Sequence, residues 1–361
     1  MTPHINAVGT AVPAHDVHDV FIDWARERVE RRALRLFDRM AGRSGIRHRW
    51  SVLPATAFAG SPGGEHGFYQ GGFPGTAARM EVYARTAPDL ALDAIARLRE
   101  RAGLDGITHI VVASCTGFVA PGIDQIIARQ LGLAPSVERL LVGFMGCYAA
   151  VAALRSARHI VRSDPQARVL VVTLELCTLH LQDTGEIEPL LAMLQFGDGA
   201  AAALVTSDPQ GFTIEQPFAT TLPESHELIR WNITDTGFVM HLSGEVPNRI
   251  AQALADEAVA AATTGGIAPT ELDGWAVHAG GRSILDAVQN AFGLAPDALD
   301  ASRGVLADYG NMSSATLMFV LERLLRGPRV DRGLALAFGP GLAAEGFGFR
   351  SAVSHAARSA A

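Results

Sequence analysis

Residues 140–163 read LLVGFMGCYAAVAALRSARHIVRS. The short apolar run at 140–145 predicts a buried strand, and the alanine-rich segment from Tyr148 onward predicts a long apolar helix. Gly146 and Cys147 occupy the turn between them, a strand-to-helix connection of the kind that exposes a nucleophile. Because a helix N-terminus carries unpaired N–H groups and partial positive charge, this position predicts a lowered pKa and a thiolate for Cys147. A buried cysteine that caps an apolar helix explains the local sequence equally well.

Apolar strands alternate with helices on both sides of this stretch. Further strands are predicted at 107–114, 167–176, 200–207, 274–278 and 333–338, and a basic amphipathic helix at 21–43. Strands that are apolar on both faces predict a parallel or mixed sheet that helices cover on both sides. The second half repeats the pattern of the first without a hydrophilic linker, so we expect two halves, residues 1–209 and 210–361, that share one interface.

The composition narrows the class of protein. The chain has 361 residues, of which 48% are hydrophobic and 19% charged, and its net charge is −7. These values are typical of a globular protein and argue against a nucleic acid or a membrane surface as the main partner. The three cysteines form no CxxC pair, so neither a disulfide framework nor a metal site is expected. No apolar run reaches the roughly 20 residues that span a bilayer, and the first residues lack the pattern of a secretory signal. We therefore expect a cytoplasmic protein without stable membrane insertion.

Two polar residues follow the predicted strands and turns of the second half. His278 ends the apolar run GWAVH, and Asn311 precedes the helical segment SSATLMFVLERLL. An imidazole at a strand end can pair with a thiolate or polarise a carbonyl, whereas a lone Asn before Ser-Ser is better explained as a turn or helix-cap residue. Taken with Cys147, the two residues fit thioester condensation, which needs a thiol to hold an acyl chain and neutral donors to stabilise an enolate. The sequence therefore predicts a thiol-dependent acyltransferase.

Four segments carry a resemblance to a known family. They are GFMGCYAA at 143–150, WAVHAGGRSILD at 275–286, DYGNMSSAT at 308–316 and AFGPGLAAEG at 337–346. In this order and at these separations they resemble the type III polyketide synthases, the chalcone synthase-like enzymes of the thiolase-like superfamily. A fatty-acid-initiating ketoacyl synthase also uses Cys, His and Asn, but it usually has HQAN-like residues where this chain has HAGG. The resemblance implies an α/β, thiolase-like fold in which two similar αβαβα halves pack as a five-layer sandwich.

The resemblance also implies a role for each of the three residues. Cys147 would accept the starter and the growing polyketide, while His278 and Asn311 would drive malonyl-CoA decarboxylation and stabilise the enolate. Acyl-CoA and malonyl-CoA are then the substrates, and no metal, flavin or nicotinamide cofactor is needed. Ala120 falls on a loop that reaches the partner subunit's cavity in the family, which implies a homodimer.

Other family positions predict the path of the substrate. Phe196 matches a phenylalanine at the junction of the CoA tunnel and the cavity, while the second gating phenylalanine is replaced by the more flexible Met240. Pro340 would shape the cavity wall. The predicted CoA-binding residues are Arg39, Arg43, Gly280 and Gly281. A third basic position of the family falls on Leu36, beside Arg35, and a solvated helix face is the alternative interpretation of these arginines.

Four cavity positions depart from the plant chalcone synthases. Threonines of the plant enzymes become Cys115, Cys177 and His180, and a glycine becomes Trp231. For the two thiols, small buried hydrophobes at strand ends are an equally good interpretation. The product is therefore open, because a fatty acyl starter would give an alkylpyrone or alkylresorcinol and malonyl-CoA as its own starter would give a naphthol. A carrier-protein-dependent ketoacyl synthase and a non-catalytic acyl-binding protein are the remaining alternatives.

Overall fold

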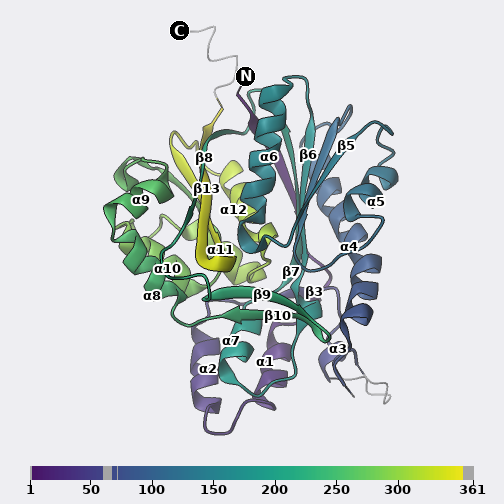
Figure 1. Ribbon diagram of the computed structural model, residues 1–361, viewed down its shortest axis with the longest axis vertical. Helices are drawn as coiled ribbons and strands as arrows, with labels where there is room; N and C mark the ends of the chain where they lie inside the picture. Colours follow the sequence, from purple (N-terminus) through teal and green to yellow (C-terminus); the bar gives the residue numbers. More distant parts are fainter. Residues whose placement is uncertain (1, 60–66, 71, 353–361) are drawn as a thin grey trace.

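A single mixed sheet forms the centre of the molecule (Figure 1) in the computed structural model, which describes residues 2–59, 67–70 and 72–352. Within these residues the sheet has nine strands in the order β11-β12-β13-β8-β1-β7-β6-β4-β5. The strands are β1 His4–Ala11, β4 His109–Ser114, β5 Glu138–Gly143, β6 Val169–Leu176, β7 Asp198–Thr206, β8 Phe212–Thr221, β11 Gly274–Val277, β12 Gly333–Gly339 and β13 Ala343–Ser351. β4 is parallel to β5 and β6, and β11 is parallel to β12, whereas the other neighbours are antiparallel. The predicted mixed sheet is confirmed.

Helices lie between and outside the two parts of this sheet. They are α1 His18–Arg26, α2 Leu34–Arg43, α3 Thr56–Ala59, α4 Thr76–Arg99, α5 Ile123–Gln130, α6 Ala149–Ser163, α7 Ile187–Met193, α8 Val246–Leu254, α9 Glu257–Thr264, α10 Arg282–Ala291, α11 Asp300–Tyr309 and α12 Ser314–Leu325. Three buried apolar clusters define the layers. α1, α2, α4 and α5 pack outside the first-half strands, α6 and α12 lie between the two parts of the sheet, and α8 and α10 pack outside β11 and β12. This is the layered α/β architecture that the sequence predicts.

The two halves meet in one continuous sheet. β1 of the first half pairs with β8 of the second through His4 with Thr213 and Ile5 with Phe212. This pairing joins the first-half strands to the second-half strands. Helices α6 and α12 pack between the two sets of strands. The expected boundary at 209/210 falls in the turn between β7 and β8, and it stays a prediction.

Several short elements surround one end of the sheet. A hairpin, β9 Ile229–Thr234 with β10 Gly237–Leu242, crosses below the sheet next to α7 (Figure 1). The remaining elements are β2 His15–Asp16, β3 Trp50–Ser51, and the single turns η1 Gly146–Tyr148, η2 Cys177–His180, η3 Pro269–Glu271 and η4 Pro340–Leu342. Among the described helices, none has both the length and the apolar character that crossing a bilayer requires.

The sequence predicts a buried strand at 140–145, but the strand in the structure is partly exposed. The structure has β5 at Glu138–Gly143, and Leu140 and Leu141 are each 43% exposed. β5 is the last strand of the sheet and, among the described residues, pairs only with β4, so one of its edges is open there. An apolar edge strand is a ready surface for pairing with another chain.

The helix predicted at 21–43 is two helices, α1 and α2, with a turn between them. α1 buries Phe21 and Trp24, and α2 buries Phe37 and Ala41. One continuous helix at 100° per residue would place Phe21 and Phe37 about 160° apart. Breaking the helix allows both apolar faces to reach the same core.

Candidate active site

The turn that carries Cys147 lies between β5 and α6. Phe144 and Gly146 both have positive φ angles, 58° and 71°. A Cβ at Gly146 would lie 2.3 Å from the Pro340 ring, so only glycine fits this position without a shift. Cys147 then falls in the single turn η1, and α6 begins two residues later, at Ala149. The predicted strand-to-helix turn is present, with a short 3₁₀ turn before the helix proper.

Asn311 approaches Cys147 from the second half of the chain. The Cys147 Sγ lies 3.9 Å from the Ser313 hydroxyl. The Asn311 Oδ1 accepts a hydrogen bond from the Ser313 N–H at 2.8 Å, and the Asn311 side-chain amide donates to the Gly280 carbonyl at 3.2 Å. Asn311 is thus no simple helix cap, because its side chain ties the Ser313 turn to the loop after His278.

His278 lies at the end of β11, where its N–H donates to the Leu336 carbonyl at 2.8 Å. Its side chain is buried, and neither ring nitrogen has a hydrogen-bond partner among the described residues. A Cβ at Gly280 would lie 3.5 Å from the His278 Nε2. The histidine and asparagine loops therefore meet at Gly280.

Burial sets the charge state of these groups. Desolvation raises the pKa of the Cys147 thiol to about 12, against a smaller lowering by hydrogen bonds from Ser313 and Asn311. Desolvation also lowers the pKa of His278 to about 3. The thiolate predicted from the helix N-terminus is therefore wrong for the resting site, because the cost of burying a charge outweighs the field of the helix. A neutral thiol becomes a strong nucleophile once a base takes its proton, and a neutral imidazole is a group that can accept one.

A small cavity, here called the inner cavity, lies directly against Cys147 and has a volume of about 20 Å³. Its walls are formed by Cys115, Thr116, Gly146, Cys147, Cys177, Phe196, Ile229, Trp231, Met240, Ser313 and Pro340. Six residues that the sequence predicts for the substrate path thus line the same cavity as Cys147. His180 is the predicted cavity residue that does not line this space.

A second cavity, here called the outer cavity, has a volume of about 300 Å³ and lies between α7 and the β9–β10 hairpin. It shares Cys177, Phe196, Trp231 and Met240 with the inner cavity. Its other walls are His180, Leu181, Gln182, Thr184, Glu186, Pro189, Met193, Val239 and His241. The two cavities therefore adjoin at these four shared side chains.

His180 and Trp231 attach the hairpin to the core. The His180 Nε2 donates to the Thr116 carbonyl at 2.7 Å, and its Nδ1 accepts the Phe238 N–H at 3.0 Å. The imidazole stacks on the Phe238 ring at 4.2 Å, and the Trp231 Nε1 donates to the Cys115 carbonyl at 2.8 Å. Burial lowers the pKa of His180 to about 3, so it serves as a fixed neutral link.

The four predicted CoA-binding residues do not all lie in one place. Arg43 lines a surface depression of about 530 Å³ beside the C-terminal end of α7, together with Leu191, Leu194 and Gln195. A Cβ at Gly281 would lie 2.3 Å from the Gln195 side chain, so Gly281 borders the same region. Arg39 is exposed on α2 but does not line this depression. Gly280 lies instead where the loops of His278 and Asn311 meet.

Sequence reasoning missed Glu175, a fully buried carboxyl at the end of β6. It accepts hydrogen bonds from the Cys115 N–H, the Thr116 hydroxyl and the Ser314 hydroxyl, and burial raises its pKa to about 7. An acidic residue inside the apolar run VLVVTLEL was the available signal. Glu175 joins the end of β4 to the start of α12. No carboxylate among the described residues hydrogen-bonds to His278, and no group of three or more potential ligands there could hold a metal.

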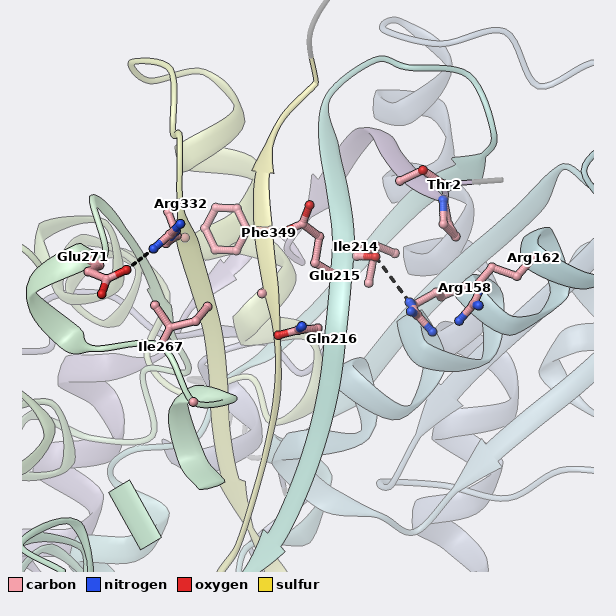
Figure 2. Close-up of a pocket in the computed structure, with 14 residues that line it drawn as sticks. Thr2, Arg158, Arg162, Ile214, Glu215, Gln216, Ile267, Glu271, Arg332 and Phe349 are labelled. Carbon is pink, nitrogen blue, oxygen red and sulfur yellow. Dashed lines mark hydrogen bonds and ion pairs between the residues drawn. The ribbon is translucent and has the colours of Figure 1, made fainter. Parts of the chain in front are cut away.

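A larger hollow lies at the other end of α6. Figure 2 shows this polar groove, in which Arg158 and Arg162 project from α6 on one side and Glu271 and Arg332 pair on the other. Its volume is about 790 Å³. Arg158 lies nine residues after the start of α6, so the groove is roughly 14 Å along the helix from its N-terminus. Cavity size alone would have pointed away from Cys147.

Comparisons with known proteins define the class of protein as an acyltransferase, a polyketide synthase. Residues 3–209 match the N-terminal domain of chalcone and stilbene synthases, and residues 213–353 match the C-terminal domain. The chain belongs to the chalcone and stilbene synthase family, that is, to the type III polyketide synthases.

Two kinds of relative support this membership. The alpha-pyrone synthesis polyketide synthase-like Pks18 of Mycobacterium tuberculosis is 34% identical over 286 residues, which are 75% of this chain and 72% of that protein. The crystal structure of PKS-I from the brown alga Ectocarpus siliculosus matches with a TM-score of 0.89 and 29% identity over 97% of this chain and 98% of that one. The type III domain of Steely1 from Dictyostelium matches with a TM-score of 0.88 and 26% identity, over 98% of this chain and all of that domain.

Proposed function

We propose that this enzyme extends a fatty acyl-CoA starter with malonyl-CoA on Cys147 and releases the product as an alkylpyrone. The observation that carries this proposal is the outer cavity, which adjoins the inner cavity and has apolar walls such as Leu181, Pro189 and Val239. An aliphatic tail gains free energy in such a space because its surface leaves water. The name of Pks18 refers to alpha-pyrone synthesis, which supports the same product class.

The neutral resting pair suggests how loading would proceed. His278 accepts the Cys147 proton as the sulfur attacks the acyl-CoA carbonyl, the carbon–sulfur bond to CoA breaks, and the departing CoA sulfur takes the proton back. His278 and Asn311 then hold the malonyl thioester oxygen while carbon dioxide leaves, and the electron pair forms an enolate. The enolate carbon attacks the acyl carbonyl, which forms the new carbon–carbon bond and frees Cys147.

The two cavities suggest how starter and extended end are divided. The inner cavity of about 20 Å³ leaves little room beyond Cys147 for a long folded polyketide. The outer cavity is larger, and Met240 at their junction is more flexible than the aromatic residue it replaces. We therefore propose a long starter tail in the outer cavity and few extensions. Ring closure follows when an enol oxygen attacks the thioester carbonyl, the carbon–sulfur bond breaks, and the departing sulfur takes the enol proton.

The proposal also covers how CoA binds and how two copies of the chain assemble. Arg43 and the nearby exposed Arg39 suit the phosphates of CoA, since guanidinium groups bind phosphate with paired donors. The exposed apolar residues Leu140 and Leu141 of β5, with Phe118 beside the same edge, suit pairing with a second copy. We propose a cytoplasmic homodimer that needs no metal or organic cofactor besides its CoA substrates.

The test is incubation with radiolabelled malonyl-CoA and acyl-CoA starters from C6 to C18, read by mass spectrometry. The proposal expects alkylpyrones whose yield depends on starter length. Products from malonyl-CoA alone that ignore added fatty acyl-CoA would favour the naphthol alternative and contradict the fatty acyl proposal. A strong rate preference for malonyl-carrier protein over malonyl-CoA would favour the ketoacyl synthase alternative.

A further inference from the structure

The turn that presents Cys147 is held in place from two sides. Two of the four residues from Phe144 to Cys147 have positive φ angles, and one of them is not glycine. Such a backbone persists only where its surroundings fix it. The Pro340 ring packs against Gly146 on one side. On the other side lies the sulfur of Cys115.

Cys115 contacts Gly146 with its side chain. The Cys115 Sγ accepts the Gly146 N–H at 2.9 Å and lies 3.7 Å from the Gly146 carbonyl oxygen. This N–H belongs to the residue directly before the nucleophile and lies in a buried turn, where an unpaired donor would be costly. The thiol therefore supplies the acceptor that the Gly146 N–H needs, at a position that threonine holds in the plant chalcone synthases.

Cys115 is itself fixed by its backbone. Its N–H donates to the Glu175 carboxyl at 3.0 Å, and its carbonyl accepts the Trp231 indole N–H at 2.8 Å. The residue is 2% exposed. Both of its backbone polar atoms and its sulfur are thus engaged, and the Cys115 Sγ contacts the nucleophile's turn from a rigid position at the end of β4.

We propose that Cys115 is a positioning residue for Cys147. By accepting the Gly146 N–H, its sulfur holds the nucleophile's turn so that the Cys147 Sγ faces Ser313 and Asn311. This role rests on the proposed function of Cys147 as the acyl-accepting nucleophile. It differs from lining the cavity, because it acts through the backbone of the turn and applies to every starter.

Cys177 provides a matched comparison within the same cavity. It is also a buried free thiol on the wall of the inner cavity. Its sulfur makes no hydrogen bond to any described residue, whereas the Cys115 sulfur bonds to Gly146. Truncating either residue enlarges the cavity, but only truncation of Cys115 leaves the Gly146 N–H without an acceptor.

The experiment compares Cys115→Ala, Cys115→Val, Cys115→Ser and Cys177→Ala in the full chain. Iodoacetamide alkylation of Cys147 is mapped by mass spectrometry, and kcat and KM are measured with one acyl-CoA starter. Displacing a nucleophile slightly lowers rates by roughly 10- to 100-fold, so we expect that loss in kcat and in alkylation for the Ala and Val variants, with KM nearly unchanged. Ser retains an acceptor and should recover part of the loss. Cys177→Ala should alter the starter profile while Cys147 alkylates at the wild-type rate.

The opposite pattern would overturn the proposal. If Cys115→Ala and Cys115→Val alkylate at Cys147 like the wild type and change only the product profile, Cys115 lines the cavity and nothing more. Near-ultraviolet circular dichroism identifies folded variants, and the comparison of Val with Ser decides the matter if Ala does not fold. The alkylation rates test positioning even if the wild type makes no polyketide, so this failure is distinguishable from failure of the proposed function.

Discussion

The two ends of α6 are built for opposite surroundings. At its N-terminal end, Cys147 is buried beside an apolar cavity of about 20 Å³, and no charged side chain lines that cavity. At its C-terminal end, Arg158 and Arg162 face an open polar groove of about 790 Å³ (Figure 2). The smaller space holds the groups that suit covalent chemistry, and the larger one is bordered by solvated charges.

Desolvation, and not volume, distinguishes the end of α6 where Cys147 lies. Burial keeps Cys147 and His278 neutral and leaves the imidazole without partners among the described residues. In such a site, donors that face a developing oxyanion gain strength because water does not compete with them. The exposed guanidinium of Arg162 at the other end is screened by solvent, so it contributes little to any single interaction.

The largest effect should come from the nucleophile. Cys147→Ala removes the sulfur that lies next to Asn311 and that we propose holds the acyl group. We expect condensation to fall by roughly 10³-fold or more, since removing a covalent nucleophile abolishes the step that depends on it. Radiolabelled malonyl-CoA incorporation measures the loss, and Cys177→Ala is the control for removing a thiol from the same cavity. Extended products from the Ala variant at near wild-type rates would show that Cys147 is not the acyl-accepting nucleophile.

The second effect concerns the charge state of the thiol. With its pKa raised to about 12, Cys147 is protonated at neutral pH, and its thiolate fraction rises with pH. Below that pKa, we expect the alkylation rate to rise about tenfold per pH unit between pH 7 and 9.5, because thiolate is the reactive form. The chain unfolded in urea should instead level off above about pH 9, near the ordinary cysteine pKa. If the alkylation rate of the folded enzyme levels off below pH 8, Cys147 is a thiolate near neutral pH, as its place at the helix N-terminus predicts.

A third and smaller effect should follow from opening the wall between the two cavities. Trp231→Ala removes a ring that both cavities share, along with its hydrogen bond to the Cys115 carbonyl. We expect the ratio of kcat/KM for long and short acyl-CoA starters to change by roughly tenfold, as is usual when a hydrophobic pocket gains space. Mass spectrometry should also detect products with more extensions.

Val239→Ala is the matched control, because Val239 lines only the outer cavity. It should shift starter preference without adding extensions. If Trp231→Ala and the wild type make products of identical length, the proposal that the starter tail lies in the outer cavity and the extended end in the inner cavity is wrong.

The layered fold follows from sequence patterns, since apolar strands that alternate with helices are local signals. The grouping of Cys147, His278 and Asn311 is predicted only through the resemblance to the type III polyketide synthases. Features that depend on contacts between distant segments do not follow from local patterns. The exposure of β5 depends on its place at the sheet edge, and the raised pKa of Cys147 depends on what covers it. Phe238 stacks on His180 from the hairpin, and no spacing in the sequence indicates that pairing.

The smallest effect should come from the groove. Arg162 has no ion-pair partner among the described residues and projects into solvent at the C-terminal end of α6 (Figure 2). Removing an exposed side chain of this kind usually changes the free energy of unfolding by no more than about 0.5 kcal/mol. We therefore expect Arg162→Ala to keep the wild-type kcat and starter profile within about twofold, measured in the same assay as the cavity variants. A larger change in kcat without loss of stability would mean that α6 couples its two ends, and the contrast between a reactive end and an inert one would then be wrong.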